Sequence, residues 1–251
     1  MINPQKDRLI FRDILSVPYE WELEKAVATT YSLDITALVS CMIPLAFSDD
    51  VSSNIFKNKI ATFTALRNLS KKLVVFSDSS EIKSYNFQKD FAVLLENMIV
   101  PVNLPQNESG NFPAFHPKMW LLQFRNKNGE HKYRLVILSR NISYDKCYDV
   151  CFVLESSDNH LKKKKTKPII DFLQYLNETI DLQSNPQLVA QKTMIENLRN
   201  DLIYEKVCFS LQDDKFSNDD FEIFPLFNSD EQKNFSKSLF ANKSLSEKEK
   251  S

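Results

Sequence analysis

The sequence predicts a layered α/β fold, an α-β-α sandwich in which helices cover both faces of a mixed, largely parallel central sheet. Between residues 33 and 77, segments of helical periodicity alternate with short apolar runs, a rhythm typical of parallel strand pairs. The run Met119–Phe124 is apolar at successive positions, which indicates a central strand buried on both faces. With 251 residues, of which 43% are hydrophobic and 26% charged, the chain can form one large domain or two small ones.

The first half of the chain is expected to contain mostly helices. Residues 1–18 read as an irregular arm or short strand, and apolar residues at helical spacing predict a helix over Tyr19–Thr29. A helix over Leu33–Phe47 can be capped by Ser32 or Asp34, and Pro44 is expected to end or kink it. The remaining elements are a helix from residue 52 or 53 to 69, a strand over 72–77, a helix over 87–97 and an extended segment over 98–104.

The second half supplies the predicted hairpin, and helices follow it. A polar loop over 105–113 leads into the strand that contains Met119–Phe124, and a further buried strand is expected over 149–155. Amphipathic helices over 169–180 and 187–203 and a strand over 206–211 follow. We therefore expect one domain over residues 1–211, with its core at about 25–160 and a helical extension at 161–203, and a linker or flexible tail over 212–251.

The dipeptide Asn128-Gly129 is the strongest turn signal in the chain, because a two-residue type I′ hairpin turn needs positive φ at both positions. With this turn, Lys127 lies opposite Glu130. Directly opposed side chains share one face of a sheet at roughly 5 Å. The predicted register therefore pairs His116 with Asn141 and Lys118 with Ser139. Imidazole, ammonium, amide and hydroxyl groups gathered at one end of a hairpin predict a phosphate site.

These residues resemble the signature of the phospholipase D superfamily, which has His-x-Lys on one strand and Gly-Ser-x-Asn on the next. Here His116-Pro117-Lys118 and Ser139-Arg140-Asn141 fill those positions, with Leu138 in place of the glycine. Gln123 stands where the family usually has aspartate, so the motif looks more like the tyrosyl-DNA phosphodiesterase branch. The resemblance implies a metal-independent phosphodiesterase with a phosphohistidine intermediate.

The resemblance also implies a role for each residue. His116 is expected to be the nucleophile or the acid that protonates the leaving oxygen, and Lys118 to neutralise phosphate oxygens. Asn141 is expected to donate hydrogen bonds to the phosphate, and Ser139 to orient the site. His131, beside the predicted turn, is expected to be exposed to solvent, and Gln123 to be structural.

The family builds its active site from two similar halves, and this chain has only one convincing half. The other formal match, His160-Leu161-Lys162, is not followed by an apolar strand. The second half is therefore expected from a partner in a homodimer or from a longer protein of which this chain is the amino-terminal part.

Three function classes follow from the resemblance. The first is a nuclease acting on DNA or RNA, with restriction or antiviral defence as its associated role. In that case Lys162, Lys163, Lys164 and Lys165 could contact the nucleic acid, although such a run can also be a solvated loop. The second is a lipid phosphodiesterase, which the lack of an aromatic-rich amphipathic face disfavours. The third is a phospholipase D-like binding or assembly subunit without catalysis.

Composition excludes several other kinds of site. Two glycines in the whole chain are too few for a phosphate-binding glycine loop, and a net charge of −1 requires any nucleic-acid contact to be local. Four cysteines without a CxxC pair and three histidines predict neither a metal site nor a cofactor. Free thiols, no signal peptide and no apolar run of about 20 residues predict a cytoplasmic protein without a membrane partner.

Overall fold

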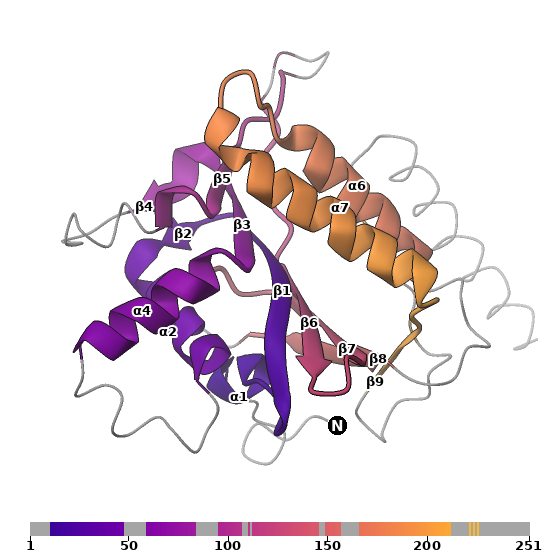
Figure 1. Cartoon of the computed structure of the whole chain (residues 1–251). Helices are drawn as coiled ribbons and strands as arrows, with labels where there is room; N and C mark the ends of the chain where they lie inside the picture. The colour runs from indigo at the N-terminus through magenta and orange to yellow at the C-terminus, as the bar shows by residue number, and fades with distance from the viewer. Residues whose placement is uncertain are drawn as a thin grey trace, which may run out of the picture.

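A computed structural model describes residues 11–47, 59–83, 95–106, 110, 112–145, 149–156, 166–211, 221, 223 and 225. Its centre is a seven-stranded sheet, shown edge-on among the helices in Figure 1. The spatial order is β5 (Ile99–Val102), β3 (Leu73–Asp78), β1 (Trp21–Thr30), β6 (Met119–Asn126), β7 (His131–Leu138), β8 (Cys151–Ser156) and β9 (Phe209–Leu211).

The sheet is mixed, as predicted. β1 pairs with β3 and β3 with β5 in parallel, whereas the other four neighbouring pairs are antiparallel. Five of the seven strands therefore run in one direction and only β6 and β8 run against them. The prediction of a mixed, largely parallel sheet holds for strand direction. Four of the six neighbouring pairs are antiparallel, and the short connection between β6 and β7 can join only antiparallel neighbours.

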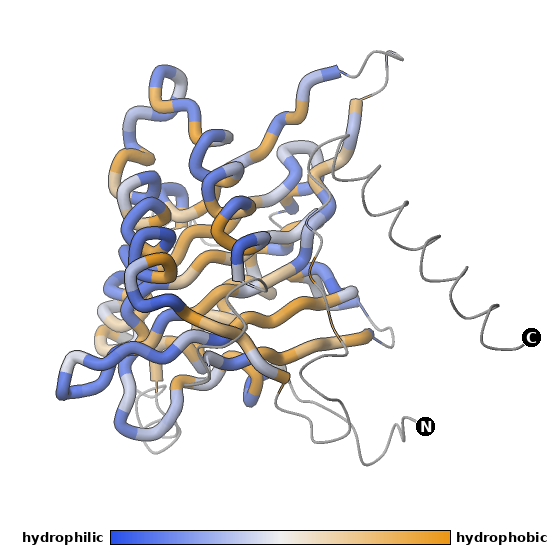
Figure 2. The backbone as a smooth tube through the Cα atoms, turned by 90° about the vertical axis from the view of Figure 1, so that its right-hand side faces the viewer, coloured by the Kyte–Doolittle hydropathy of each residue, from blue (hydrophilic) through white to orange (hydrophobic). Residues whose placement is uncertain are grey.

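Helices cover both faces of the sheet, which confirms the layered α/β class. α1 (Phe11–Leu15), α2 (Ile35–Ala46) and α4 (Lys59–Ser70) pack on one face and enclose the first core. α6 (Lys167–Thr179) and α7 (Val189–Tyr204) pack on the other and enclose the second core. Figure 2 shows the strands as a largely hydrophobic part of the chain. None of the helices in the described residues is long and apolar enough to span a bilayer.

β6 is the central strand that its sequence predicts. Its even positions, Trp120, Leu122 and Phe124, lie in the first core, and Met119 and Leu121 lie in the second. All five are buried. Burial on both faces is the reason that this strand shows no alternation of polar and apolar residues.

β1 occupies the stretch in which the sequence predicts a helix, and that prediction is wrong. Ala26 and Ala28 are buried in the first core and Val27 in the second, between β3 on one side and β6 on the other. A strand buried on both faces loses the period-two pattern that identifies it. The alanine, glutamate and lysine of the segment favour a helix locally, and the tertiary context overrides them.

The helices expected elsewhere are largely confirmed. Asp34 caps α2, since its Oδ1 accepts hydrogen bonds from the backbone of Thr36 at 2.7 Å and of Ala37 at 3.1 Å. α2 continues two residues past Pro44 before it ends at Ala46. α4, α6, α7 and the strands β3, β5, β8 and β9 also agree with expectation.

Short elements complete the fold near the carboxyl end of β1. β2 (Leu33–Asp34) pairs in parallel with β4 (Ile82–Lys83), which follows the 3₁₀ turn η2 (Ser79–Glu81). A second 3₁₀ turn, η4 (Pro186–Leu188), precedes α7. The predicted start of the helix at 52 or 53, most of the helix at 87–97 and nearly all of the tail over 212–251 lie outside the described residues.

Candidate functional site

The turn between β6 and β7 sets the register of the hairpin, and it differs by one residue from the prediction. Asn126 donates its backbone N–H to Glu130 O at 3.1 Å, and Gly129 (φ +86°) closes a three-residue loop by donating to Asn126 O at 3.0 Å. Glycine is needed there because other residues avoid positive φ. Leu138, not Ser139, therefore lies opposite Lys118, with Leu138 N to Lys118 O at 3.0 Å. The predicted pairing of His116 with Asn141 is wrong for the same reason.

The segment that carries the histidine motif lies at the carboxyl ends of β1 and β3. It precedes β6, whose first residue, Met119, pairs with Thr29 near the end of β1. From β1 the chain proceeds to β3 and β5 on one side and returns to β6 on the other (Figure 1). The carboxyl end of β1 thus adjoins the segment that enters β6, and ligands of open α/β sheets bind outside the carboxyl ends of strands.

Two hydrogen bonds fix this segment at its two ends. Asp78, the last residue of β3, accepts the backbone N–H of Phe115 at 2.9 Å, and Thr29 Oγ1 accepts that of Met119 at 3.1 Å. Burial opposes ionisation of Asp78, but hydrogen bonds from Ser80 and Phe115 lower its pKa overall. Phe115 is itself buried in the second core. The histidine between these anchors is therefore presented from a rigid base.

His116 and Lys118 lie together. His116 is exposed, whereas Lys118 is only 9% exposed, and Lys118 Nζ lies 2.9 Å from His116 Nδ1 and 3.3 Å from Nε2. Burial, followed by the charge of Lys118, lowers the pKa of His116. Burial also lowers the pKa of Lys118. The arrangement favours a neutral imidazole, the protonation state that a nucleophile needs, with the Lys118 ammonium donating to its Nδ1 lone pair.

Asn141 reaches the same region through the end of β1. Its Oδ1 accepts the backbone N–H of Ser32 at 3.3 Å and lies 3.5 Å from Thr30 Oγ1. Thr30 Oγ1 in turn accepts the N–H of Ile142 at 3.0 Å. Because the amide oxygen is engaged, the amide NH₂ is the group with which Asn141 can bind an anion.

Tyr31 connects the pair His116 and Lys118 to Asn141. Its ring centroid lies 5.1 Å from that of His116, and Lys118 Nζ lies 6.0 Å from the tyrosine ring centroid. Its chain neighbours, Thr30 and Ser32, hold Asn141. His116, Lys118 and Asn141 therefore all lie at the end of β1. They are brought there by contacts with residues 30–32, whereas the prediction placed them directly opposite one another in the hairpin.

Ser139 does not contact this cluster in the described residues and is bound instead by residues just before β8. Its Oγ donates to Asp149 Oδ1 at 3.0 Å and accepts the N–H of Val150 at 2.9 Å. Arg140 lies 3.5 Å from the other oxygen of Asp149 and donates to the carbonyl oxygens of Ser143 and Asp145. These contacts tie the end of β7 to the start of β8. The predicted approach of Ser139 to Lys118 is wrong, and His160 and Lys162–Lys165 lie outside the described residues.

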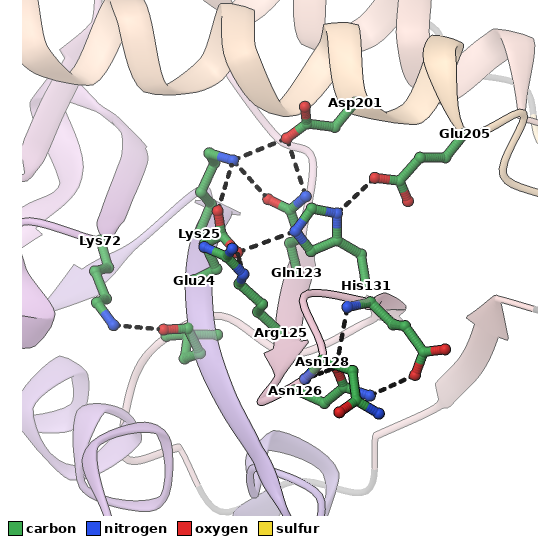
Figure 3. Close-up of polar contacts among 12 residues, drawn as sticks. Glu24, Lys25, Lys72, Gln123, Arg125, Asn126, Asn128, His131, Asp201 and Glu205 are labelled. Atoms are coloured by element: carbon green, nitrogen blue, oxygen red, sulfur yellow. Dashed lines mark hydrogen bonds and ion pairs between the residues drawn. The ribbon is translucent and has the colours of Figure 1, made fainter.

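Sequence reasoning missed a second polar cluster at the opposite end of β6, drawn in Figure 3. The side chain of His131 is 18% exposed, contrary to the solvent-exposed position expected for it. Its Nδ1 lies 2.5 Å from Glu205 Oε1 and its Nε2 lies 3.1 Å from Glu24 Oε2. A neutral imidazole has a single N–H, so donation to both carboxylates requires the protonated ring.

Gln123 connects this cluster to α7. Lys25 Nζ donates to Gln123 Oε1, and Gln123 Nε2 donates to Tyr133 OH and to Asp201 Oδ2, each at 3.0 Å. Burial, reinforced by the neighbouring Glu205, raises the pKa of Tyr133. Burial opposes ionisation of Asp201, but hydrogen bonds from Lys25 and Gln123 lower its pKa. These hydrogen bonds link three strands to a helix, an arrangement that fits the structural role expected for Gln123.

In the part of the chain that the structure describes, no group of three or more His, Cys, Asp or Glu side chains is arranged to hold a metal ion. No protein-family model and no curated protein matches this chain. The functional argument therefore depends on the geometry at the end of β1.

Proposed function

We propose that His116, Lys118 and Asn141 bind a phosphodiester and that the protein is a metal-independent phosphodiesterase, acting on DNA or RNA. The observation that supports this most directly is the 2.9 Å contact between Lys118 Nζ and His116 Nδ1 at the carboxyl end of β1. A cation beside an exposed imidazole of lowered pKa combines electrostatic attraction for phosphate with a nucleophile. The phospholipase D-like motif supports the same chemistry.

In the proposed reaction a ring nitrogen of His116 attacks phosphorus. A P–N bond forms while the P–O bond to the leaving group breaks, and the departing oxygen takes a proton from an acid. Water then attacks the phosphorus, the P–N bond breaks, and the proton released by water returns to the conjugate base of that acid. Lys118, as an ammonium, compensates the phosphate charge. Asn141 donates its amide N–H to a phosphate oxygen.

The acid must come from outside the cluster. Of the histidines that the structure describes, the other is His131, which is bound to Glu24 and Glu205 at the opposite end of β6. We propose that a second half supplies the acid, either through homodimerisation or from a further part of a longer chain. We also propose that Lys162, Lys163, Lys164 and Lys165 contact the backbone of the nucleic acid. A role in restriction or antiviral defence follows only by association with the family.

A second candidate is a binding or assembly subunit without catalysis. The contacts that favour it are those of Ser139, which is engaged by Asp149 and Val150 and so is withdrawn from the anion site. In this alternative Lys118 and Asn141 still bind phosphate, but no P–O bond is broken.

Hydrolysis of bis(p-nitrophenyl) phosphate and of single- and double-stranded DNA and RNA in EDTA tests the proposal. We expect turnover by the unmodified chain, loss of activity in His116→Ala, and at least a tenfold loss in Lys118→Met, since the cation acts on the charged transition state. Lys71→Met is the matched control, because this lysine is exposed at the other end of β3. Phosphodiester binding without turnover favours the second candidate, and activity that survives His116→Ala contradicts the first.

A further inference from the structure

One aromatic ring packs against both functional groups of the candidate site. Tyr31 directly follows β1 and is half-buried. Its ring meets the imidazole of His116 at 5.1 Å between centroids with an interplanar angle of 34°, and Lys118 Nζ lies 6.0 Å from its centroid. Aromatic pairs at this separation attract each other, and the face of a tyrosine attracts a nearby cation.

The backbone of Tyr31 is held firmly. Ser77 Oγ donates to Tyr31 O at 3.1 Å, and Thr30 Oγ1 donates to Ser32 O at 2.8 Å, across the residue itself. Thr30 and Ser77 are buried. The tyrosine ring therefore extends from an anchored part of the sheet, and the His116 side chain that it contacts is exposed.

We propose that Tyr31 is a positioning residue, whose ring fixes the orientation of the His116 imidazole beside Lys118. An exposed histidine populates several rotamers, and only some present a ring nitrogen to a bound phosphate. Packing against Tyr31 restricts that choice and covers one side of the imidazole. The catalytic consequence rests on the proposed function, but the orientation itself does not.

Coverage by Tyr31 also explains the electrostatics of the site. Burial is the main cause of the lowered pKa of both His116 and Lys118, although the histidine is largely exposed. A ring packed against both groups removes water from each of them. The tyrosine hydroxyl makes no hydrogen bond to the described residues, so the ring and not the hydroxyl carries the role.

NMR of the full chain, labelled at the histidine ring carbons, tests this directly. We expect nuclear Overhauser contacts between the ring protons of Tyr31 and His116 in the unmodified protein, and their absence would overturn the proposal. In Tyr31→Leu we expect the titration midpoint of His116 to rise toward its ordinary value, and in Tyr31→Phe to stay as in the unmodified chain.

A shift of equal size in Tyr31→Phe and Tyr31→Leu would overturn the role of the ring, as would no shift in Tyr31→Leu. Should Tyr31→Leu not fold, Tyr31→Val, which suits the end of a strand, replaces it. Hydrolysis of bis(p-nitrophenyl) phosphate measures the effect on catalysis. We expect kcat to fall roughly ten- to hundredfold in Tyr31→Leu and to be retained in Tyr31→Phe. If the unmodified chain is inactive, the proposed function fails while the NMR result still decides the orientation of His116.

Discussion

Replacing Gln123 with leucine tests whether the polar cluster around His131 stabilises the fold or forms a site of its own. Gln123 is fully buried and makes three hydrogen bonds at 3.0 Å, two of them to the charged groups of Lys25 and Asp201. At about 1.5–3 kcal/mol for each charged bond and about 1 kcal/mol for the neutral one, these bonds contribute roughly 4–7 kcal/mol.

Two effects offset that loss. The ion pair between Lys25 and Asp201, at 2.8 Å, does not involve Gln123 and should persist. The buried leucine side chain regains about 2–3 kcal/mol of apolar burial. We therefore expect the free energy of unfolding to fall by about 2–4 kcal/mol and the melting temperature by roughly 5–15 °C.

Urea unfolding measures this loss, with Gln187→Leu as the matched control. Gln187 is exposed, so its replacement should change stability by less than about 0.5 kcal/mol. Phosphodiester hydrolysis by Gln123→Leu, measured well below its melting temperature, should equal that of the unmodified chain, because the network lies at the other end of β6 from His116. A stability equal to that of the control, or a folded variant without activity, would refute the structural role of this cluster.

The remaining predictions concern charge and pH. Lys118→Met should raise the pKa of His116, because it removes a neighbouring positive charge, and NMR titration measures the shift. The acid limb of the pH–rate profile should lie below the ordinary histidine pKa of about 6.5, since protonated His116 cannot attack; a limb above it contradicts the nucleophile. Burial raises the pKa of Glu155, but Lys132 and Arg134 lower it overall. Glu155→Gln should therefore be less stable than the unmodified chain at pH values above the unfolded glutamate pKa of about 4.3. As pH falls through the lower pKa of the folded state, urea unfolding should show that this difference in stability disappears.

The sequence predicts those parts of the fold in which local signals and tertiary burial agree. Asp34 has the side chain that caps a helix, and the helix begins there. β6 is apolar on both faces because helices cover both faces of the sheet. β1 is the opposite case, because its alanine, lysine and glutamate residues favour a helix while its neighbours β3 and β6 impose a strand.

The candidate site was predictable in composition but not in geometry. The motif identifies His116, Lys118 and Asn141, yet a loop of three residues instead of two shifts the hairpin register and removes their direct opposition. Tyr31 could not be found from the sequence, because its place beside His116 depends on β1 being a strand adjacent to β6. A correct strand prediction for β1 would have pointed to the residues at its carboxyl end.

Detection of a covalent phosphoryl group on His116 tests the central claim most directly. The chain is mixed with bis(p-nitrophenyl) phosphate in EDTA, quenched in base to preserve the P–N bond, and mapped by peptide mass spectrometry. The proposed chemistry predicts a p-nitrophenyl phosphoryl adduct on His116 that decays with turnover and is absent from His116→Ala. Turnover without any adduct on His116, or an adduct on another residue, would contradict it.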